Sequence, residues 1–311
     1  MAPSPTELPE ILPPGLRLAG RYVIGDLIGD GGMAKVYRGE HDTIGRAVAI
    51  KVLAGDLTSE PVVVVRFLQE AKAASKIRHE NVVEVTDFGE TEDGRPFMVM
   101  EYLEGEDLAD TLAREHRLPW DRVQPILLQL LAALQAVHQQ GVVHRDIKPE
   151  NIFLVSRMGS NEYVKVFDFG IAKVLQGGAT MGKSLTIKGQ LIGTPPYMSP
   201  EQCLGENVDA RSDLYTVGVI AYELVTGRTP FFTDDPAKML RMHVKEPPPA
   251  MADVAPGLPI HPGVEAIIRR ALAKDRDERY SSAYEMAKAI LRETPESTSP
   301  LLPGLRQVLA P

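Results

Sequence analysis

The sequence predicts an α+β fold in two parts, a small first part that is mainly β with one helix and a larger second part that is mainly helical. Three observations support this prediction. Short β-branched runs separated by glycine turns fill residues 22–53. One helical stretch and two further strand-like runs follow, up to residue 103. Beyond Gly105, the long segments carry apolar residues at helical spacing.

The first part should form an antiparallel sheet, because its runs are too close together for a helix to connect parallel strands. The expected helix covers residues 61–79, where Phe67, Ala71 and Ala74 recur at helical spacing. The expected strands are 22–29, 34–41, 46–53, 82–90 and 96–103.

The second part should contain long helices around a loop-rich centre at residues 142–201. A strongly amphipathic helix is expected at 119–141, with Pro119 at its start and Gly141 just beyond its end. The segment 208–227 is apolar on all sides, which is typical of a fully buried helix. Further helices are expected at 261–275 and 281–293.

The two ends differ in composition from the rest. Residues 1–18 are proline-rich and are expected to be flexible, and residues 293–311, rich in Pro, Ser and Thr, are expected to be a tail or linker. The domain between them covers 19–292, divided into a first part of about 19–103 and a second of about 104–292.

Charge and composition exclude several classes of protein. The net charge of −8 argues against a nucleic-acid partner, because neutralising phosphates needs a basic face. Cys203 is the only cysteine, so a disulfide framework is excluded. The most apolar stretch, 214–225, is too short to be a membrane segment and contains Glu223. We therefore expect a soluble, cytoplasmic protein.

The stretch "LIGDGGMAKVY", residues 27–37, is dense in glycine. Gly29, Gly31 and Gly32 would let backbone N–H groups approach a phosphate, because no Cβ stands in the way. Taken alone, the stretch fits a plain hairpin turn equally well. It is neither a dinucleotide-binding nor a Walker loop, because a strand follows instead of a helix and no Gly-Lys-Ser/Thr ends the run.

Two charged residues lie downstream of this loop. Lys51 stands in the otherwise apolar run "VAIKVL", and Glu70 stands in the middle of the next helix. Each has an ordinary explanation, as an exposed lysine on an edge strand and a solvated glutamate on a helix. The alternative is a cation that contacts nucleotide phosphates and is held by a carboxylate.

The segments "HRDIKPEN" (144–151) and "VFDFG" (166–170) decide between these alternatives. Together with the glycine loop and "VAIK", they resemble the eukaryotic-type (Hanks-type) protein kinases. The wording "GGMAKVY" and "GTPPYMSPEQ" is most similar to the bacterial serine/threonine branch. The resemblance covers about residues 22–292. It implies a bilobal protein-kinase-like fold and transfer of the ATP γ-phosphoryl group to Ser/Thr hydroxyls of proteins.

The resemblance also implies the roles of the catalytic residues. Asp146 would orient the substrate hydroxyl and accept its proton, and Lys148 would neutralise the transferring phosphoryl group. Lys51 would contact the α- and β-phosphates of ATP, with Glu70 as its ion-pair partner. Lys148 resembles the serine/threonine rather than the tyrosine kinases.

Cofactor contacts follow in the same way. Asn151 and Asp168 would provide oxygen ligands for Mg²⁺, with Mn²⁺ as an alternative metal. Met100 would be the gatekeeper beside the adenine. The ATP contacts implied by the resemblance are Ile28, Gly29, Gly31, Gly32, Val36, Ala49, Lys51, Met100, Glu101, Leu103 and Phe153.

Other residues would regulate or brace the site. Arg145 would receive a phosphate from the activation segment, and Thr194 would hydrogen-bond the catalytic Asp and Lys. Autophosphorylation in trans within a homodimer is expected, with Thr186 as the leading site. The full set of candidate phosphosites and bracing residues is Thr186, Ser184, Thr180, Asp213, Glu201 and Arg279.

Two rival functions share the same fold. A pseudokinase or ATP-binding scaffold would be indicated by losses among the catalytic and metal-binding residues, and none is lost. A kinase-fold enzyme acting on a small molecule would usually lack the glycine-loop wording and the "GTPPYMSPEQ" segment.

Overall fold

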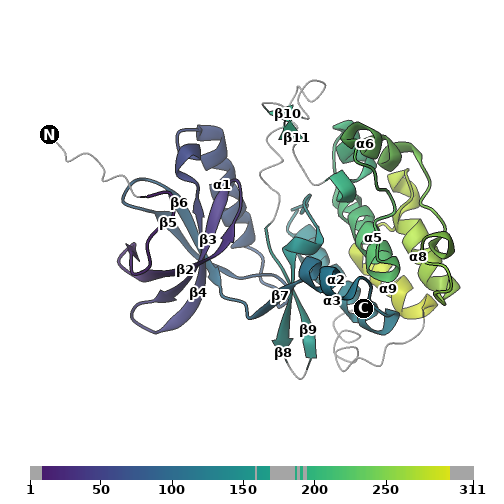
Figure 1. Cartoon of the computed structure of the whole chain (residues 1–311), viewed down its shortest axis with the longest axis horizontal. Coiled ribbons are helices and arrows are strands. Elements are labelled where there is room, and N and C mark those ends of the chain that lie inside the picture. Colours follow the sequence, from purple (N-terminus) through teal and green to yellow (C-terminus); the bar gives the residue numbers. More distant parts are fainter. Residues whose placement is uncertain (1–8, 158–159, 169–185, 188–189, 192–194, 295–311) are drawn as a thin grey trace. The chain divides into compact units, whose positions relative to one another are not determined.

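The computed structural model describes residues 9–157, 160–168, 186–187, 190–191 and 195–294. The chain divides into two compact units, one formed by residues 1–78 and 83–104 and the other by residues 79–82 and 105–311. The first unit holds a sheet and one α-helix, and the described part of the second is mainly helical (Figure 1).

The first unit is built on a six-stranded antiparallel sheet in the order β1-β2-β3-β4-β6-β5. Helix α1, Pro61–Ala74, packs on it through Phe67 and Ala71, which cluster with Met98 and other apolar side chains of the sheet. The strands are β1 Arg17–Leu18, β2 Tyr22–Asp30, β3 Ala34–His41, β4 Arg46–Leu53, β5 Val85–Glu90 and β6 Pro96–Glu101.

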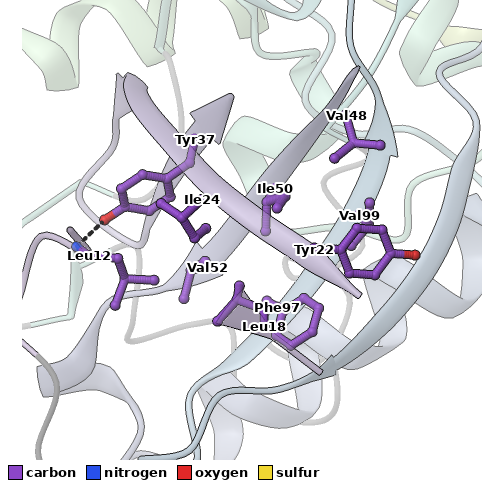
Figure 2. Close-up of a cluster of buried hydrophobic side chains, with 10 residues drawn as sticks. All are labelled: Leu12, Leu18, Tyr22, Ile24, Tyr37, Val48, Ile50, Val52, Phe97 and Val99. Carbon is purple, nitrogen blue, oxygen red and sulfur yellow. Dashed lines mark hydrogen bonds between the residues drawn. The ribbon is translucent and has the colours of Figure 1, made fainter. Parts of the chain in front are cut away.

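The segment before β2 is part of this unit. Leu12 is 1% exposed and lies in a cluster with side chains of the sheet, and its amide donates to the Tyr37 hydroxyl at 3.0 Å (Figure 2). The buried Arg95 donates to the carbonyl oxygens of Pro9 and Glu10, at 3.1 and 3.5 Å.

The predicted flexibility of residues 1–18 is therefore wrong for residues 9–18. Proline content suggested a loose segment, but two leucines, one between the prolines and one after them, decide its position. Leu12 and Leu18 are both buried in the sheet's apolar cluster, and β1 pairs with β2. Removing these side chains from water is favourable and offsets the ordering of the chain. Residues 1–8 lie outside the described part.

The second unit contains a three-stranded sheet in the order β7-β8-β9. Its strands are β7 Gly105–Asp107, β8 Ile152–Arg157 and β9 Ser160–Val166. A two-stranded ladder joins β10, Thr186–Ile187, to β11, Gln190–Leu191. Residues 142–201, expected to be loop-rich, thus hold most of this β-structure. Strands β8 and β9 are at least as long as the predicted β5 and β6, and they were missed because the polar catalytic segment precedes them.

The helices of the second unit pack around α3 and α5. Helix α5 is buried on nearly all sides, as its composition predicted, and Gly218 lets it approach Ala271 closely. The helices are α2 Leu108–Glu115, α3 Trp120–Gln139, α4 Pro200–Leu204, α5 Ala210–Thr226, α6 Pro236–Lys245, α7 Met251–Val254, α8 Pro262–Ala271 and α9 Ala283–Glu293. In the described ranges, no helix combines the length and apolar character needed to cross a bilayer.

Burial of Leu12 yields a first prediction. Leu12→Ala should lower the free energy of unfolding by about 2–4 kcal/mol, because it leaves a cavity in the sheet's apolar cluster. The neighbouring Ile11 is 52% exposed and provides the matched control. The free energy of unfolding of Ile11→Ala should stay within about 0.5 kcal/mol of the wild-type value. Denaturant unfolding measures both, and equal effects of the two substitutions would contradict the packing described here.

Candidate active site

Lys51 and Glu70 form an ion pair inside the first unit. Lys51 Nζ lies 3.3 Å from Glu70 Oε1, and each side chain is 13% exposed. Strand β4 is paired with β3 on one side and β6 on the other, so Lys51 is not on an edge strand. The two ordinary explanations, an edge lysine and a solvated glutamate, therefore do not hold. Removing either partner would take a counter-charge away from a largely buried charge.

The glycine-rich stretch connects β2 to β3. Gly29 pairs with Val36 in the ladder, and the Gly31 amide donates to Ala34 O at 3.1 Å. A Cβ at Gly31 would lie 3.2 Å from that same oxygen, whereas one at Gly32 would meet nothing. The stretch is thus a hairpin between antiparallel strands, which can serve as a phosphate-binding flap as well.

The residues expected around adenine fall in both units. In the first, Ala49 is buried and pairs with Met100, and the Glu101 amide donates to Glu84 O at 3.1 Å. Val36 and Leu103 are half-buried, and Ile28 is 48% exposed. In the second unit, Phe153 on β8 makes an edge contact with Phe167, with ring centroids 6.4 Å apart.

Asp213, on α5, holds the catalytic segment of the second unit. Its carboxylate is 1% exposed and accepts the backbone amides of His144 and Arg145, each at 2.9 Å. His138 Nε2 lies 2.7 Å from the same carboxylate. Two successive amides on one fixed carboxylate define the path of the chain directly before Asp146. The backbone at Arg145 has a φ of 67°, a left-handed conformation that such contacts must maintain.

Asn151 links this segment to the next one. Its Nδ2 donates to Asp146 O at 2.8 Å, and its own carbonyl accepts the Phe167 amide at 3.2 Å. Asp168, with a φ of 56°, follows Phe167 directly. The side-chain Nδ2 of Asn151 donates this hydrogen bond, and its Oδ1 is the atom suited to bind a metal.

These donors fit a magnesium ion. Mg²⁺ typically takes one or two carboxylate or amide oxygens from the protein and completes its shell with phosphate oxygens and water. Asn151 and Asp168 supply that number of oxygens. Among the described residues no cluster of three or more His, Cys, Asp or Glu could hold a metal by protein groups alone.

His144 is fully buried, and its Nε2 lies 3.2 Å from Phe167 O. Burial lowers the pKa of His144, although the charges of Asp213 and Asp146 oppose the shift. The neutral ring therefore serves as a packed, hydrogen-bonded support between the two segments rather than as an exchanging base.

Arg145 is half-buried. Burial lowers the pKa of its guanidinium, and the charge of Asp213 opposes this effect. Its Nε is buried and has no hydrogen-bond partner among the described residues. The expected phosphosites Thr180 and Ser184 and the expected Thr194 lie outside the described residues, and Thr186 is described only as a strand residue of β10.

Glu201 and Arg279 form a bidentate pair, with distances of 2.8 and 2.9 Å, and the Ser212 hydroxyl donates to the same carboxylate. Both side chains are at most 3% exposed. Burial alone would raise the pKa of Glu201, but the hydrogen bonds and charge of Arg279, with Ser212, hold it below its usual value.

Two supporting residues were missed in the sequence. Gln202 Nε2 donates to Arg145 O at 2.8 Å, and its Oε1 accepts the Ser199 amide. Asn81 Nδ2 donates to Val164 O at 2.8 Å. Gln202 could have been found from "SPEQ", because a Ser followed three residues later by Gln indicates a helix capping box.

Comparison with known proteins identifies the family. The sequence profile of the protein kinase domain matches residues 22–293. The chain belongs to the protein kinase domain family. The family resemblance and the fold class that were predicted from the sequence are thus confirmed.

Individual relatives are bacterial. The chain is 45% identical over 278 residues to the serine/threonine-protein kinase pkn3 of Myxococcus xanthus, covering 89% of this chain and 50% of that protein. It is 40% identical over 282 residues to PknB of Mycolicibacterium smegmatis, covering 88% and 43%. The solved PknI kinase domain of Mycobacterium tuberculosis gives a TM-score of 0.69 at 27% identity, covering 91% of this chain and all of that one. The chain spans half or less of the curated relatives it matches.

The Glu201–Arg279 pair yields a prediction with a pH signature. Glu201→Gln should lower the free energy of unfolding by about 3–5 kcal/mol near neutral pH, because Arg279 keeps its charge without a counter-ion. A carboxylate whose pKa is lowered in the folded protein stabilises the fold at pH values above its ordinary pKa of about 4.3. It loses this effect as the pH falls through its pKa in the folded protein. The difference in the free energy of unfolding between variant and wild type should therefore become smaller as the pH is lowered below about 4.

Denaturant unfolding across pH measures this difference. Glu206→Gln is the matched control, because Glu206 pairs with Arg276 at the surface and its side chain is 54% exposed. Glu206→Gln should lower the free energy of unfolding by less than about 1 kcal/mol. A loss for Glu201→Gln no larger than the control would contradict the structural role of the buried pair.

Proposed function

We propose that the chain is a serine/threonine protein kinase domain that transfers the γ-phosphoryl group of ATP to hydroxyls of protein substrates. The observation that carries the proposal is the catalytic segment itself. Asp213 fixes the backbone before Asp146, and Asn151 fixes the backbone at Asp146. The curated relatives named above support it, because each is named a serine/threonine-protein kinase.

In this mechanism the protein mainly positions groups and neutralises charge, as phosphoryl transfer requires. Asp146 accepts a hydrogen bond from the substrate hydroxyl and takes up its proton as the new O–P bond forms and the bond from the γ-phosphorus to the bridging oxygen of ATP breaks, with ADP as the leaving group. Lys148 neutralises the oxygens of the transferring group. Lys51, held by Glu70, binds the α- and β-phosphates. Gly29, Gly31 and Gly32 carry the backbone that covers the phosphates.

Asn151 and Asp168 would hold the metal, for which we propose Mg²⁺, with Mn²⁺ as an alternative. A divalent ion held there would neutralise negative charge on the phosphates of ATP. Asn151 contributes its Oδ1 because its Nδ2 donates to Asp146 O, so the metal ligand and the proposed base are positioned together.

Regulation would act through Arg145. A half-buried guanidinium whose Nε lacks a described partner is suited to a phosphate on the activation segment, which would add strong charge-assisted hydrogen bonds. We propose autophosphorylation, with Thr186 ahead of Thr180 and Ser184, and a transient homodimer as the arrangement for reaction in trans. ATP as the donor implies that the domain works in the cytoplasm.

A scaffold without activity is the second candidate, but no observation favours it. Such a protein needs no proton acceptor and no ordered catalytic segment, whereas this chain keeps both Asp146 and the carboxylate of Asp213 that anchors the adjacent amides.

The function is tested by transfer of radiolabel from ATP to the protein itself and to a generic protein substrate. Asp146→Asn should lower the rate by about 10²–10⁴-fold, because the amide cannot accept the hydroxyl proton. Phosphosites mapped on the wild-type protein should include Thr186. Undiminished transfer by Asp146→Asn, in protein with wild-type thermal unfolding, would contradict the mechanism.

A further inference from the structure

The glycine-rich hairpin between β2 and β3 carries a carboxylate of its own. Asp30 stands between Gly29 and Gly31, at the end of β2, and it is exposed. The proposed mechanism uses the backbone on either side of Asp30 to cover the phosphates of ATP. Consecutive Cα atoms are about 3.8 Å apart, whereas the Debye length is about 10 Å at roughly 0.1 M salt. An unbalanced charge at Asp30 would therefore repel the phosphates.

Lys35, on β3, balances this charge. It lies opposite Asp30 in the ladder, so the two side chains are on the same face of the sheet. Lys35 Nζ donates to Asp30 Oδ1 at 2.7 Å, and the side chain of Lys35 is only 9% exposed. This hydrogen bond raises the pKa of Lys35, burial opposes the rise, and the contact with Glu10 adds to it. The amine is therefore charged at neutral pH.

The N-terminal segment supplies a second partner for this lysine. Glu10 Oε1 lies 3.4 Å from Lys35 Nζ. The backbone at Glu10 is held by Arg95, which donates to its carbonyl oxygen at 3.5 Å and to that of Pro9 at 3.1 Å. One ammonium group thus lies between two carboxylates, one from the hairpin and one from the N-terminal segment. Without Lys35, both carboxylates would lose this counter-ion.

Pairing within the hairpin distinguishes Lys35 from an ordinary lysine on a sheet. Residues 27–37 contain one acidic residue, Asp30, and one basic residue, Lys35, and the two are bonded to each other. A lysine that only covers apolar surface keeps its amine in water. Lysines are rarely buried unless they are paired, because the ammonium group loses its hydration. The largely buried Lys35 instead donates to the carboxylate that stands between Gly29 and Gly31.

We propose that Lys35 neutralises Asp30 and thereby allows the glycine-rich hairpin to close over the phosphates of ATP. Lys35 acts through Asp30, so it is a positioning residue for nucleotide binding. Glu10 holds its ammonium group from the side of the N-terminal segment. The inference rests on the proposed kinase function, which places the phosphates beside this hairpin.

Equilibrium binding of ATP, in the presence of magnesium chloride, tests the proposal in Lys35→Met, Asp30→Asn and the double variant. At an ionic strength of about 0.01 M, Lys35→Met should raise the Kd for ATP about three- to tenfold, because the carboxylate then faces the phosphates without its counter-ion. Methionine keeps the apolar stem of the lysine on the sheet. Adding Asp30→Asn to Lys35→Met should return the Kd to within about twofold of wild type, because a positive and a negative charge are then lost together.

Three controls separate this effect from a general loss of structure. Adenosine has no phosphates, so its Kd should stay within about twofold of wild type in every variant. At about 1 M salt the Debye length is about 3 Å, and the rise in the Kd for ATP should fall below about twofold. Lys76→Met removes the same charge at an exposed position beyond the end of α1 and should leave the Kd for ATP within about twofold of wild type.

Several outcomes would overturn this inference alone. One is a Kd for ATP in Lys35→Met that equals the wild-type value at low ionic strength. Another is a raised Kd that Asp30→Asn does not lower, and a third is an equal rise in the Kd for adenosine, since each leaves Lys35 with a structural role only. Failure of the wild-type protein to bind ATP at all would overturn the proposed function, and this inference with it.

Discussion

The carboxylate of Asp213 is the constraint on which the rest of the candidate site depends. It is buried in α5 and accepts two successive amides of the catalytic segment. Without it, the left-handed backbone at Arg145 would have no fixed support, and two buried amides would lose their acceptor. The buried helix α5 thus sets the position of Asp146 through the backbone of the two residues before it.

Other contacts connect the catalytic segment to neighbouring segments of the second unit. Asn151 ties the segment to Phe167, and Gln202 ties Arg145 O to the start of α4. Helix α4 is in turn joined to the end of the second unit by the buried Glu201–Arg279 pair.

Much of this could be predicted from the sequence, for identifiable reasons. Strand periodicity and glycine turns indicated the antiparallel sheet, and the apolar surface of α5 indicated its burial. The motifs named Lys51 and Glu70, which the structure brings together at 3.3 Å. The burial of Leu12 was missed. The composition of the segment shows the prolines around Leu12, but it does not show that Leu12 packs into the apolar cluster that contains Tyr37.

The most direct test of the central claim is the steady-state kinetics of Asp213→Asn. An amide in this place keeps the size of the side chain but can accept with one oxygen only, so one buried amide of the catalytic segment loses its partner. We expect kcat for a peptide substrate to fall at least about tenfold while KM for ATP changes less than about threefold. A kcat equal to that of wild type, in folded protein, would contradict the claim that Asp213 positions the catalytic segment.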